Sequence, residues 1–461
     1  MGREQTRRKR PFLHPHGLEA DQPHSTLCRY SPSFSGSDPP QKFVNSTPAS
    51  SVEDNFRLRR TSKQTNQFAL QEQLVSLDLG IGCPGSPCLA WRTLVTLDTH
   101  AQLTPACSNT EAPARPLAID HWLASSILQK AIRRGDAELA ARAALTLFDA
   151  RGATIWRRFM VIAFEDIGAG CIETVGDTVI LGTDKDARLA AGSDEEVAVW
   201  LARRLAHAPK DRSSDYLICS ARNHVNLDQA RDLIGSRSVA DRVAMVLDPS
   251  LPLPVRATAA WYASGIEWTG EKRVGRGDLP GLISAFRMLG VPDRFASATR
   301  LAALRSREPI TLMVPLIWVA AFGGEYPEVR EDPCPLPRML GEIPSYAFDK
   351  HTRIGKRAIT LLARENEAVR NCLEHHVPEF RHRQTTWVAA FYADATPISR
   401  RLVWDQSRPL EALGMENDLM REGVPQAGVI PLVEAIKGNL DHLNEIRQRL
   451  WDASLPNGEV R

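Results

Sequence analysis

The chain has 461 residues, a length typical of two or three domains of about 100–200 residues each. Hydrophobic residues make up 43% and charged residues 24% of the chain, so it can bury a sizeable core. Its formal net charge is only +2, which excludes a strong overall attraction to nucleic acid or to an anionic membrane. Any contact with phosphates therefore requires a local cluster of basic residues.

Residues 1–112 are rich in Ser, Pro, Thr, Gln and Asn and show no sustained helical or strand periodicity. Such a composition does not bury enough apolar surface to offset the entropy lost on ordering, so it predicts a disordered tail. Two alternatives stay open. The segment is either a basic, flexible tail that contacts a partner, or disordered sequence with no such role, for example one that arises from a start codon assigned too far upstream.

After the tail, apolar residues recur at helical spacing. The pattern predicts a helix over 123–132 that ends at Gly135, and a second over 139–148 that Asp136 caps. Thr154 is expected to cap a third helix, because a threonine hydroxyl accepts a hydrogen bond from an amide in the first helical turn. The first part of the ordered chain is therefore predicted to be helical throughout.

The helical pattern continues to the end of the chain. Ser193 and Glu196 have the spacing of a capping box, and the helix that they open has to end by Pro209. The proline-rich segment from Gly323 to Pro344 is typical of a loop. Further helices are predicted over 255–268, 279–289, 310–322, 354–362 and 432–450.

These patterns predict an all-α fold, a multi-helix bundle or helical array with a disordered N-terminal segment. They divide the chain into the tail, a helical domain over 113–322 and a C-terminal helical region over 345–461. The isolated β-leaning stretch 178–181 is too short and too far from any other to build a sheet.

Motifs for catalysis are missing from the sequence. No GxxxxGK[ST] phosphate loop, GxSxG or HExxH occurs, so we expect no nucleotide cofactor and no metal. The run ending in Glu165 and Asp166 has the appearance of a Walker B strand. Without a phosphate loop it is predicted to be a helix that ends at Gly168, with the acidic pair facing solvent or a helix cap. His375 and His376 are adjacent, so they point about 100° apart on a helix and do not easily share a metal.

The cysteines and the apolar segments indicate the cellular compartment of the protein. The eight cysteines include no CxxC pair and lack zinc-site spacing, which favours a reducing compartment. No apolar stretch follows the basic first ten residues, so no secretory signal is predicted. The most apolar run, 310–322, is shorter than the ~20 residues needed to span a bilayer. The expectation is a cytoplasmic protein without a membrane partner.

Basic doublets are the remaining signal, because arginine suits bidentate contact with phosphate. Doublets occur at 133–134, 157–158, 203–204, 356–357 and 400–401. In a chain with such balanced charge most of them are expected to pair with acids. As candidate DNA-binding residues we take Arg133, Arg134, Arg157, Arg158, Lys210, Arg212, Arg353, Lys356 and Arg357.

Three phrases in order carry a family resemblance: SILQKAIRRGD at 126–136, AFEDIG at 163–168 and AHAPKDR at 206–212. They are similar to the phrases SAFIKSIRGSD, ASEDIG and LAPKSN of the MgsA/RarA family of replication-associated AAA+ ATPases. There they belong to the clamp-loader-like collar that follows the ATPase module. The resemblance covers about 120–215. Phe164 and Asp211 stand where the family has serine, and the ATPase module has no counterpart here.

The resemblance implies a helical collar that forms homo-oligomers and lies near DNA at stalled replication forks, without ATP hydrolysis. It suggests a non-catalytic protein of DNA replication or repair. The partners that it suggests are DNA, a replication ATPase or a single-strand-binding protein. Such a protein should carry a contiguous basic surface drawn from the doublets.

Two other classes of function stay open. A purely structural protein-interaction module would pair its basic doublets with acids and leave no basic patch. An enzyme with a dispersed site, built for example from Glu342, Asp349 and His351, would gather them in a concave pocket.

Overall fold

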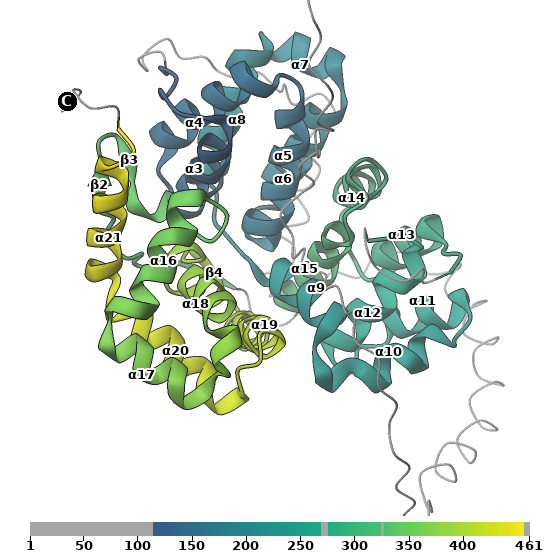
Figure 1. Ribbon diagram of the computed structural model, residues 1–461. Helices are drawn as coiled ribbons and strands as arrows, with labels where there is room; N and C mark the ends of the chain where they lie inside the picture. The colour runs from purple at the N-terminus through teal and green to yellow at the C-terminus, as the bar shows by residue number, and fades with distance from the viewer. Residues whose placement is uncertain (1–113, 269–274, 324–326, 456–461) are drawn as a thin grey trace, which may run out of the picture. The chain divides into compact units, whose positions relative to one another are not determined.

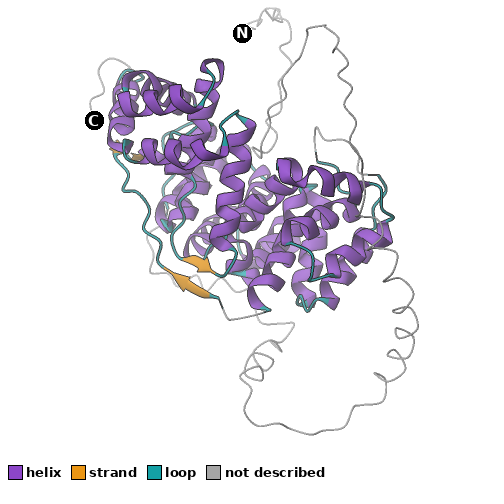
Figure 2. Ribbon diagram, turned by 90° about the horizontal axis from the view of Figure 1, so that it is seen from below, coloured by secondary structure: helices purple, strands orange, loops and turns teal. Residues whose placement is uncertain are grey.

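In a computed structural model of the chain, the structure describes residues 114–268, 275–323 and 327–455 (Figures 1 and 2). These residues fall in one compact unit. They form nineteen α-helices and four short strands, which confirms the all-α prediction for the described part of the chain. The predicted disordered tail lies outside the described residues.

The first part of the described chain consists of α3 (His121–Arg134), α4 (Ala137–Arg151), α5 (Thr154–Ile162), the π-helical turn η1 (Ala163–Ile167), the 3-10 turn η2 (Gly168–Gly170), α6 (Ile172–Thr183), α7 (Lys185–Ala191), α8 (Asp194–His207) and α9 (Ser213–Asn223). The next part consists of η3 (Val225–Leu227), α10 (Asp228–Gly235), α11 (Val239–Leu247), α12 (Leu253–Ser264), α13 (Leu279–Met288), α14 (Asp293–Ser306), η4 (Pro309–Leu312) and α15 (Met313–Phe322).

The last part consists of β1 (Glu328–Arg330), β2 (Met339–Leu340), β3 (Ile343–Pro344), η5 (Ser345–Ala347), α16 (Arg353–Glu365), α17 (Glu367–His376), η6 (Glu379–Arg381), α18 (His382–Ala390), the π-helical turn η7 (Phe391–Ala395), β4 (Arg401–Val403), α19 (Ser407–Arg421), α20 (Gln426–Lys437) and α21 (Leu440–Asp452).

Local signals in the sequence position several helix ends. Gly135 ends α3 in the left-handed conformation, and the Asp136 carboxylate caps α4 by accepting a hydrogen bond from the amide of Leu139. The capping box of Ser193 and Glu196 is present in full. These predictions are confirmed.

Other predicted boundaries are wrong. Thr154 lies inside α5 rather than capping it, and its hydroxyl donates to the carbonyl of Arg151. The helix predicted over 432–450 is two helices, because the chain turns at Gly438 and Asn439 between α20 and α21. The one predicted over 310–322 begins as the 3-10 turn η4, with a proline at its first position.

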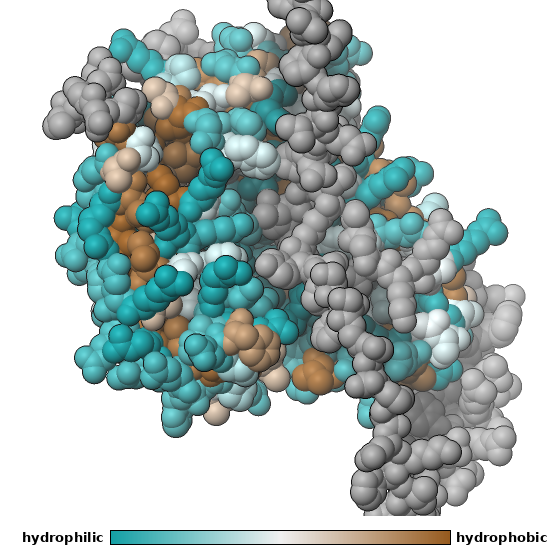
Figure 3. Space-filling view, in the orientation of Figure 1, coloured by the Kyte–Doolittle hydropathy of each residue, from teal (hydrophilic) through white to brown (hydrophobic). Residues whose placement is uncertain are grey.

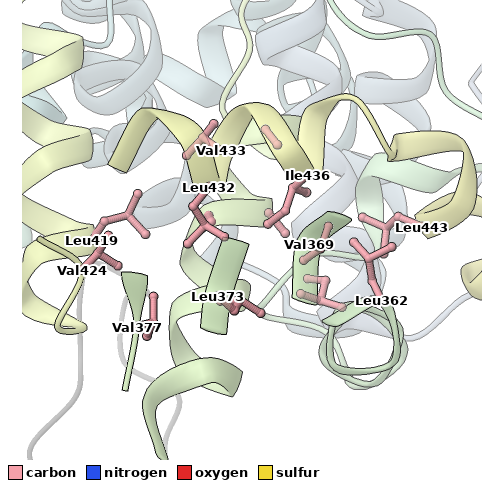
Figure 4. Close-up of a cluster of buried hydrophobic side chains, with 14 of the residues drawn as sticks. Leu362, Val369, Leu373, Val377, Leu419, Val424, Leu432, Val433, Ile436 and Leu443 are labelled. Carbon is pink, nitrogen blue, oxygen red and sulfur yellow. The ribbon is translucent and has the colours of Figure 1, made fainter. Parts of the chain in front are cut away.

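The helices bury continuous apolar layers. α4 packs against α3 and α8, and α9 packs against α19 from the C-terminal part of the chain. Figure 4 shows a second layer, in which side chains of α16, α17, α20 and α21 meet. Its members include Leu362, Leu373, Leu432, Ile436 and Leu443, each nearly or fully buried. Interdigitated aliphatic side chains of this kind contribute most of the free energy of folding.

The strands are minor. β1 pairs antiparallel with β4, and β2 pairs antiparallel with β3. The backbone of Lys210 adds a parallel bridge at Arg401 of β4. Through this bridge, the segment between α8 and α9 is fastened to the C-terminal part of the chain.

The described surface visible in Figure 3 is mainly hydrophilic, with an apolar area at the left beside α21. Among the described residues, every helix is too short or too polar to cross a bilayer.

A close backbone approach joins the end of η1 to the segment before α9. Gly168 has φ +52°, and a Cβ built on it would lie 2.3 Å from the carbonyl oxygen of Asp211. The amide of Asp211 donates to the carbonyls of Asp166 and Ile167 at 3.2 and 3.1 Å. Only glycine fits a positive φ with another backbone in contact.

We therefore expect Gly168→Ala to lower the free energy of unfolding by well over 1 kcal/mol, because both the backbone strain and the collision act together. Gly152 is a matched control. Its backbone angles, φ 54° and ψ −138°, resemble the 52° and −133° of Gly168, yet nothing lies within 4 Å of an added Cβ. Urea denaturation of both variants measures the difference. Equal losses of stability would show that the close approach contributes nothing.

Candidate functional site

The most unusual feature of the described chain is a cluster of buried charges, which we call the ionic centre: Arg133, Glu165, Asp166, Arg212 and Asp215. Asp166 is fully buried at its middle. Its Oδ1 accepts from Arg133 Nε and from Arg212 Nη1, both at 2.6 Å, and its Oδ2 accepts from the amide of Gln129 at 2.8 Å. One carboxylate thus connects α3, η1 and the start of α9.

Arg133 has all its donor nitrogens engaged. Nε binds Asp166, Nη2 donates to Glu165 at 2.7 Å, and Nη1 donates to the carbonyl of Ala395 at 2.9 Å. Glu165 and Asp166 belong to the π-helical turn η1 and Ala395 to η7. Single π-helical turns inside helices are frequent at functional sites. Here both turns present acceptors to one guanidinium.

The electrostatics of the ionic centre are set by burial and by neighbouring charges. Burial disfavours the ionised form of Asp166, but Arg133 and Arg212 outweigh burial and lower the pKa of this carboxyl. Burial raises the pKa of Asp215, although its partner Arg212 acts in the opposite direction. Asp166 therefore stays ionised to a lower pH than an ordinary carboxyl, whereas Asp215 takes up its proton at a higher pH than an ordinary carboxyl.

A second buried ion pair lies along α3. Lys130 Nζ is 2.9 Å from Asp349 Oδ2, and both side chains are almost fully buried. The pKa of Asp349 is lowered: burial opposes ionisation, but attraction by Lys130 prevails. The same turn of α3 carries Ser126, whose hydroxyl donates to the carbonyl of Ala347 at 2.7 Å. Asp349 lies four residues before Arg353, so this pair fixes the approach to α16.

Lys210 closes the C-terminus of α8. Its Nζ donates to the carbonyls of Ala206 and Ala208 at 2.6 and 2.7 Å, which satisfies acceptors that the helix leaves free. Burial, with repulsion from Arg400, lowers the pKa of Lys210 to about 8. Pro209 and Lys210 thus have a structural role in the turn between α8 and α9, next to β4.

The structure corrects one prediction and places three candidate residues in the interior. Glu165 and Asp166 do precede the helix end at Gly168, but they face the interior and bind arginines rather than solvent or a cap. Three of the candidate DNA-binding residues are also inside the protein, where a phosphate has no access, because they satisfy buried acceptors. These are Arg133, Lys210 and Arg212.

Three more candidate residues are engaged within the protein. The guanidinium of Arg134 stacks 4.1 Å from the Tyr346 ring and contacts Asp394, Arg157 pairs with Glu308 at 3.3 Å, and Arg158 donates to Gln129 at 2.6 Å. The remaining doublets, which were not among the candidates, pair with acids as well. Arg203 pairs with Glu138, Arg204 with Asp177, Arg400 with Glu331, and Arg401 with Asp332 and Glu411.

The last three candidates behave differently. Arg353, Lys356 and Arg357 are exposed on the first turns of α16, and none of them forms an ion pair within the described residues. Arg383 of α18 is also exposed, and its guanidinium carbon and Lys356 Nζ each lie 5.4 Å from the ring centroid of Trp387. We call these four cations and Trp387 the α16 patch. The candidates drawn from the sequence include its α16 residues, but the contribution of α18 depends on tertiary packing.

The dispersed catalytic group does not assemble. Asp349 is buried against Lys130, His351 is exposed, and Glu342 pairs with Arg142 at the surface. No cluster of three or more His, Cys, Asp or Glu side chains in the described part of the chain could hold a metal ion.

Comparison of the chain with protein-family models, with curated proteins and with solved structures finds no match. The resemblance to the MgsA/RarA collar therefore stays a prediction that rests on the three phrases alone.

Because the pKa of Asp166 is lower in the folded chain than the ordinary value of about 4, this group stabilises the fold above about pH 4 and loses its contribution as the pH falls below that. We expect Asp166→Asn to lower the free energy of unfolding by about 3–5 kcal/mol at pH 7, because two buried arginines lose the anion that they share. The difference in unfolding free energy between wild type and variant should narrow between pH 5 and pH 3, as measured by urea denaturation.

Asp293→Asn is the matched control for this experiment. Asp293 pairs with Arg287 at 2.8 Å, but its side chain is 87% exposed. A surface pair of this kind contributes less than about 1 kcal/mol. If the loss of unfolding free energy caused by Asp166→Asn stays constant from pH 7 to pH 3, the assignment of a low pKa to Asp166 is contradicted.

Proposed function

We propose that this chain is a non-catalytic helical protein of DNA replication or repair, and that it binds the phosphates of nucleic acid through the α16 patch. The observation that carries the proposal is the set of exposed cations on α16 that have no acidic partner among the described residues. The other basic doublets are engaged inside the protein or with surface acids, so the α16 patch is where phosphate contact is best supported.

The placement of these cations favours an anion. Arg353, Lys356 and Arg357 lie at spacings of three and four residues, so they share one face of the helix. They sit at the N-terminus of α16, where the helix dipole is positive and where acidic residues would normally be stabilising; the first turn contains none. Three like charges at a positive helix end repel one another, and an anion at this position relieves the repulsion.

Trp387 also favours a nucleic-acid partner. Its indole nitrogen donates to the carbonyl of Lys356 at 3.1 Å and to the hydroxyl of Thr360 at 3.0 Å, which fixes the ring against α16. The ring lies between cations from two helices. Proteins that bind single-stranded nucleic acid combine aromatic rings with basic groups, because bases stack on the rings and phosphates contact the cations. Trp387 is half-buried among basic groups and offers this combination.

The resemblance to the MgsA/RarA collar gives this proposal its biological frame. It supports a place beside DNA at a replication fork, with a replication ATPase or a single-strand-binding protein as a further partner. It also supports self-association of the chain. These partners rest on the resemblance, whereas the contact with phosphate rests on the α16 patch.

A second function, a protein-interaction module without nucleic-acid contact, is favoured by a separate observation. The doublets at 133–134, 203–204 and 400–401 pair with acids within the described chain, as that function requires. The two functions differ in one respect. Only the first requires a surface that binds phosphate.

The full-length chain should bind fluorescent single-stranded and forked DNA, and the logarithm of the binding constant should fall linearly with the logarithm of salt concentration. The triple variant Arg353→Ala, Lys356→Ala, Arg357→Ala should weaken binding at least tenfold. It should also reduce the salt slope by about two to three, because each lost phosphate contact removes about one released counterion.

The matched control removes the same charge from three other exposed arginines on or beside different helices: Arg237→Ala, Arg300→Ala, Arg421→Ala. It should retain most of the affinity. Absence of DNA binding by the wild-type chain at low salt would refute the proposal and leave the protein-interaction module as the better reading. Equal losses in both triple variants would show a diffuse charge effect and no defined patch.

A further inference from the structure

A second cationic feature lies away from α16. Residues of α5, α6, α7 and α14 line a shallow cavity of about 340 Å³ that is open to solvent. Four of its lining residues are cations, and none is acidic: Arg157, Lys185, Arg188 and Arg305. We infer that this cavity binds a small phosphorylated molecule, through phosphate oxygens that meet these cations.

The cations divide into a fixed pair and an uncommitted pair. Arg188 is buried; it donates to Asp194 at 2.8 Å and to the carbonyl of Leu181 at 2.8 Å. Arg157 reaches Glu308 at 3.3 Å, and its side chain is 47% exposed. Both are held in place before any ligand arrives, which lowers the entropic cost of binding.

Lys185 and Arg305 are the uncommitted pair. Both are exposed, and neither forms an ion pair within the described residues. They lie on α7 and α14, so they approach the cavity from two different helices. A phosphate group suits such a pair, because lysine acts as a point charge and arginine donates two parallel hydrogen bonds to the same anion.

Trp156 forms part of the wall of the cavity. It is only 3% exposed, and its indole nitrogen makes no hydrogen bond within the described residues. The Arg188 guanidinium covers the ring at 4.6 Å from its centroid. A buried N–H group without an acceptor destabilises the fold, and buried tryptophan nitrogens usually find a partner.

Size and charge together indicate the class of ligand. The volume exceeds what one phosphate fills, and the cations come from three helices, which favours a diphosphate or a phosphate ester over a single inorganic ion. This site is independent of the α16 patch, since the two share no residue.

Inorganic pyrophosphate is the probe, titrated into the full-length chain at constant ionic strength with sodium chloride as the reference. Pyrophosphate should raise the midpoint of thermal unfolding in a dose-dependent manner, because it binds only the folded chain. The double variant Lys185→Ala, Arg305→Ala should weaken the affinity for pyrophosphate at least tenfold.

The matched control Arg237→Ala, Arg421→Ala removes the same charge from two exposed arginines outside both the cavity and the α16 patch, and it should retain pyrophosphate binding. No stabilisation beyond that of chloride, or full binding by the Lys185/Arg305 double variant, would overturn the inference. A short single-stranded oligonucleotide distinguishes the source of the phosphate. Its affinity should be the same for wild type and for the Lys185/Arg305 variant; a parallel loss would assign the cavity to a nucleic-acid surface and overturn the small-molecule site.

Discussion

The structure depends on how one buried carboxylate, that of Asp166, is neutralised. An isolated charge in a protein interior costs several kcal/mol, and without Asp166 the two arginines that bind it would keep only Glu165 and Asp215 as anionic partners. Arg133 and Arg212 come from segments almost eighty residues apart, so the charge is tolerated only when α3, η1 and the start of α9 are assembled together. Arg133 binds two different carboxylates and Asp166 binds two different arginines, so these directional hydrogen bonds favour one register of the three elements.

The same constraint extends to the C-terminal helices. Arg133 also binds the carbonyl of Ala395, while Asp394 accepts from Arg134 and, through its other oxygen, from Arg447 of α21 at 2.7 Å. Two π-helical turns, far apart in sequence, are therefore satisfied by adjacent arginines of α3. With the Lys130–Asp349 pair just before α16, this arrangement connects the interior to the α16 patch, so the position of the proposed phosphate-binding surface depends on buried charges.

The elements that the sequence predicted correctly are those specified by neighbours in the chain. Gly135 and the Ser193–Glu196 box act within one helical turn, and the apolar periodicity of α3 and α13 reports burial directly. The role of Arg133 could not be predicted in this way, because a basic doublet at a helix end has the same appearance whether it faces solvent or a carboxylate 32 residues away. One signal was available: Glu165 and Asp166 are flanked on both sides by apolar residues, which is unusual for an acidic pair that faces water.

The near-neutral charge of the chain thus conceals an uneven distribution. In the interior, Lys130, Arg133 and Arg212 are matched by Asp349, Asp166, Glu165 and Asp215, so the buried charges largely cancel. Cations left over appear at the surface, on α16 and around the cavity beside α7. Salt screens exposed charges over about 8–10 Å but hardly reaches buried pairs. Raising the salt concentration should therefore weaken anion contacts at the surface while the ionic centre keeps the helices assembled, which separates binding from folding.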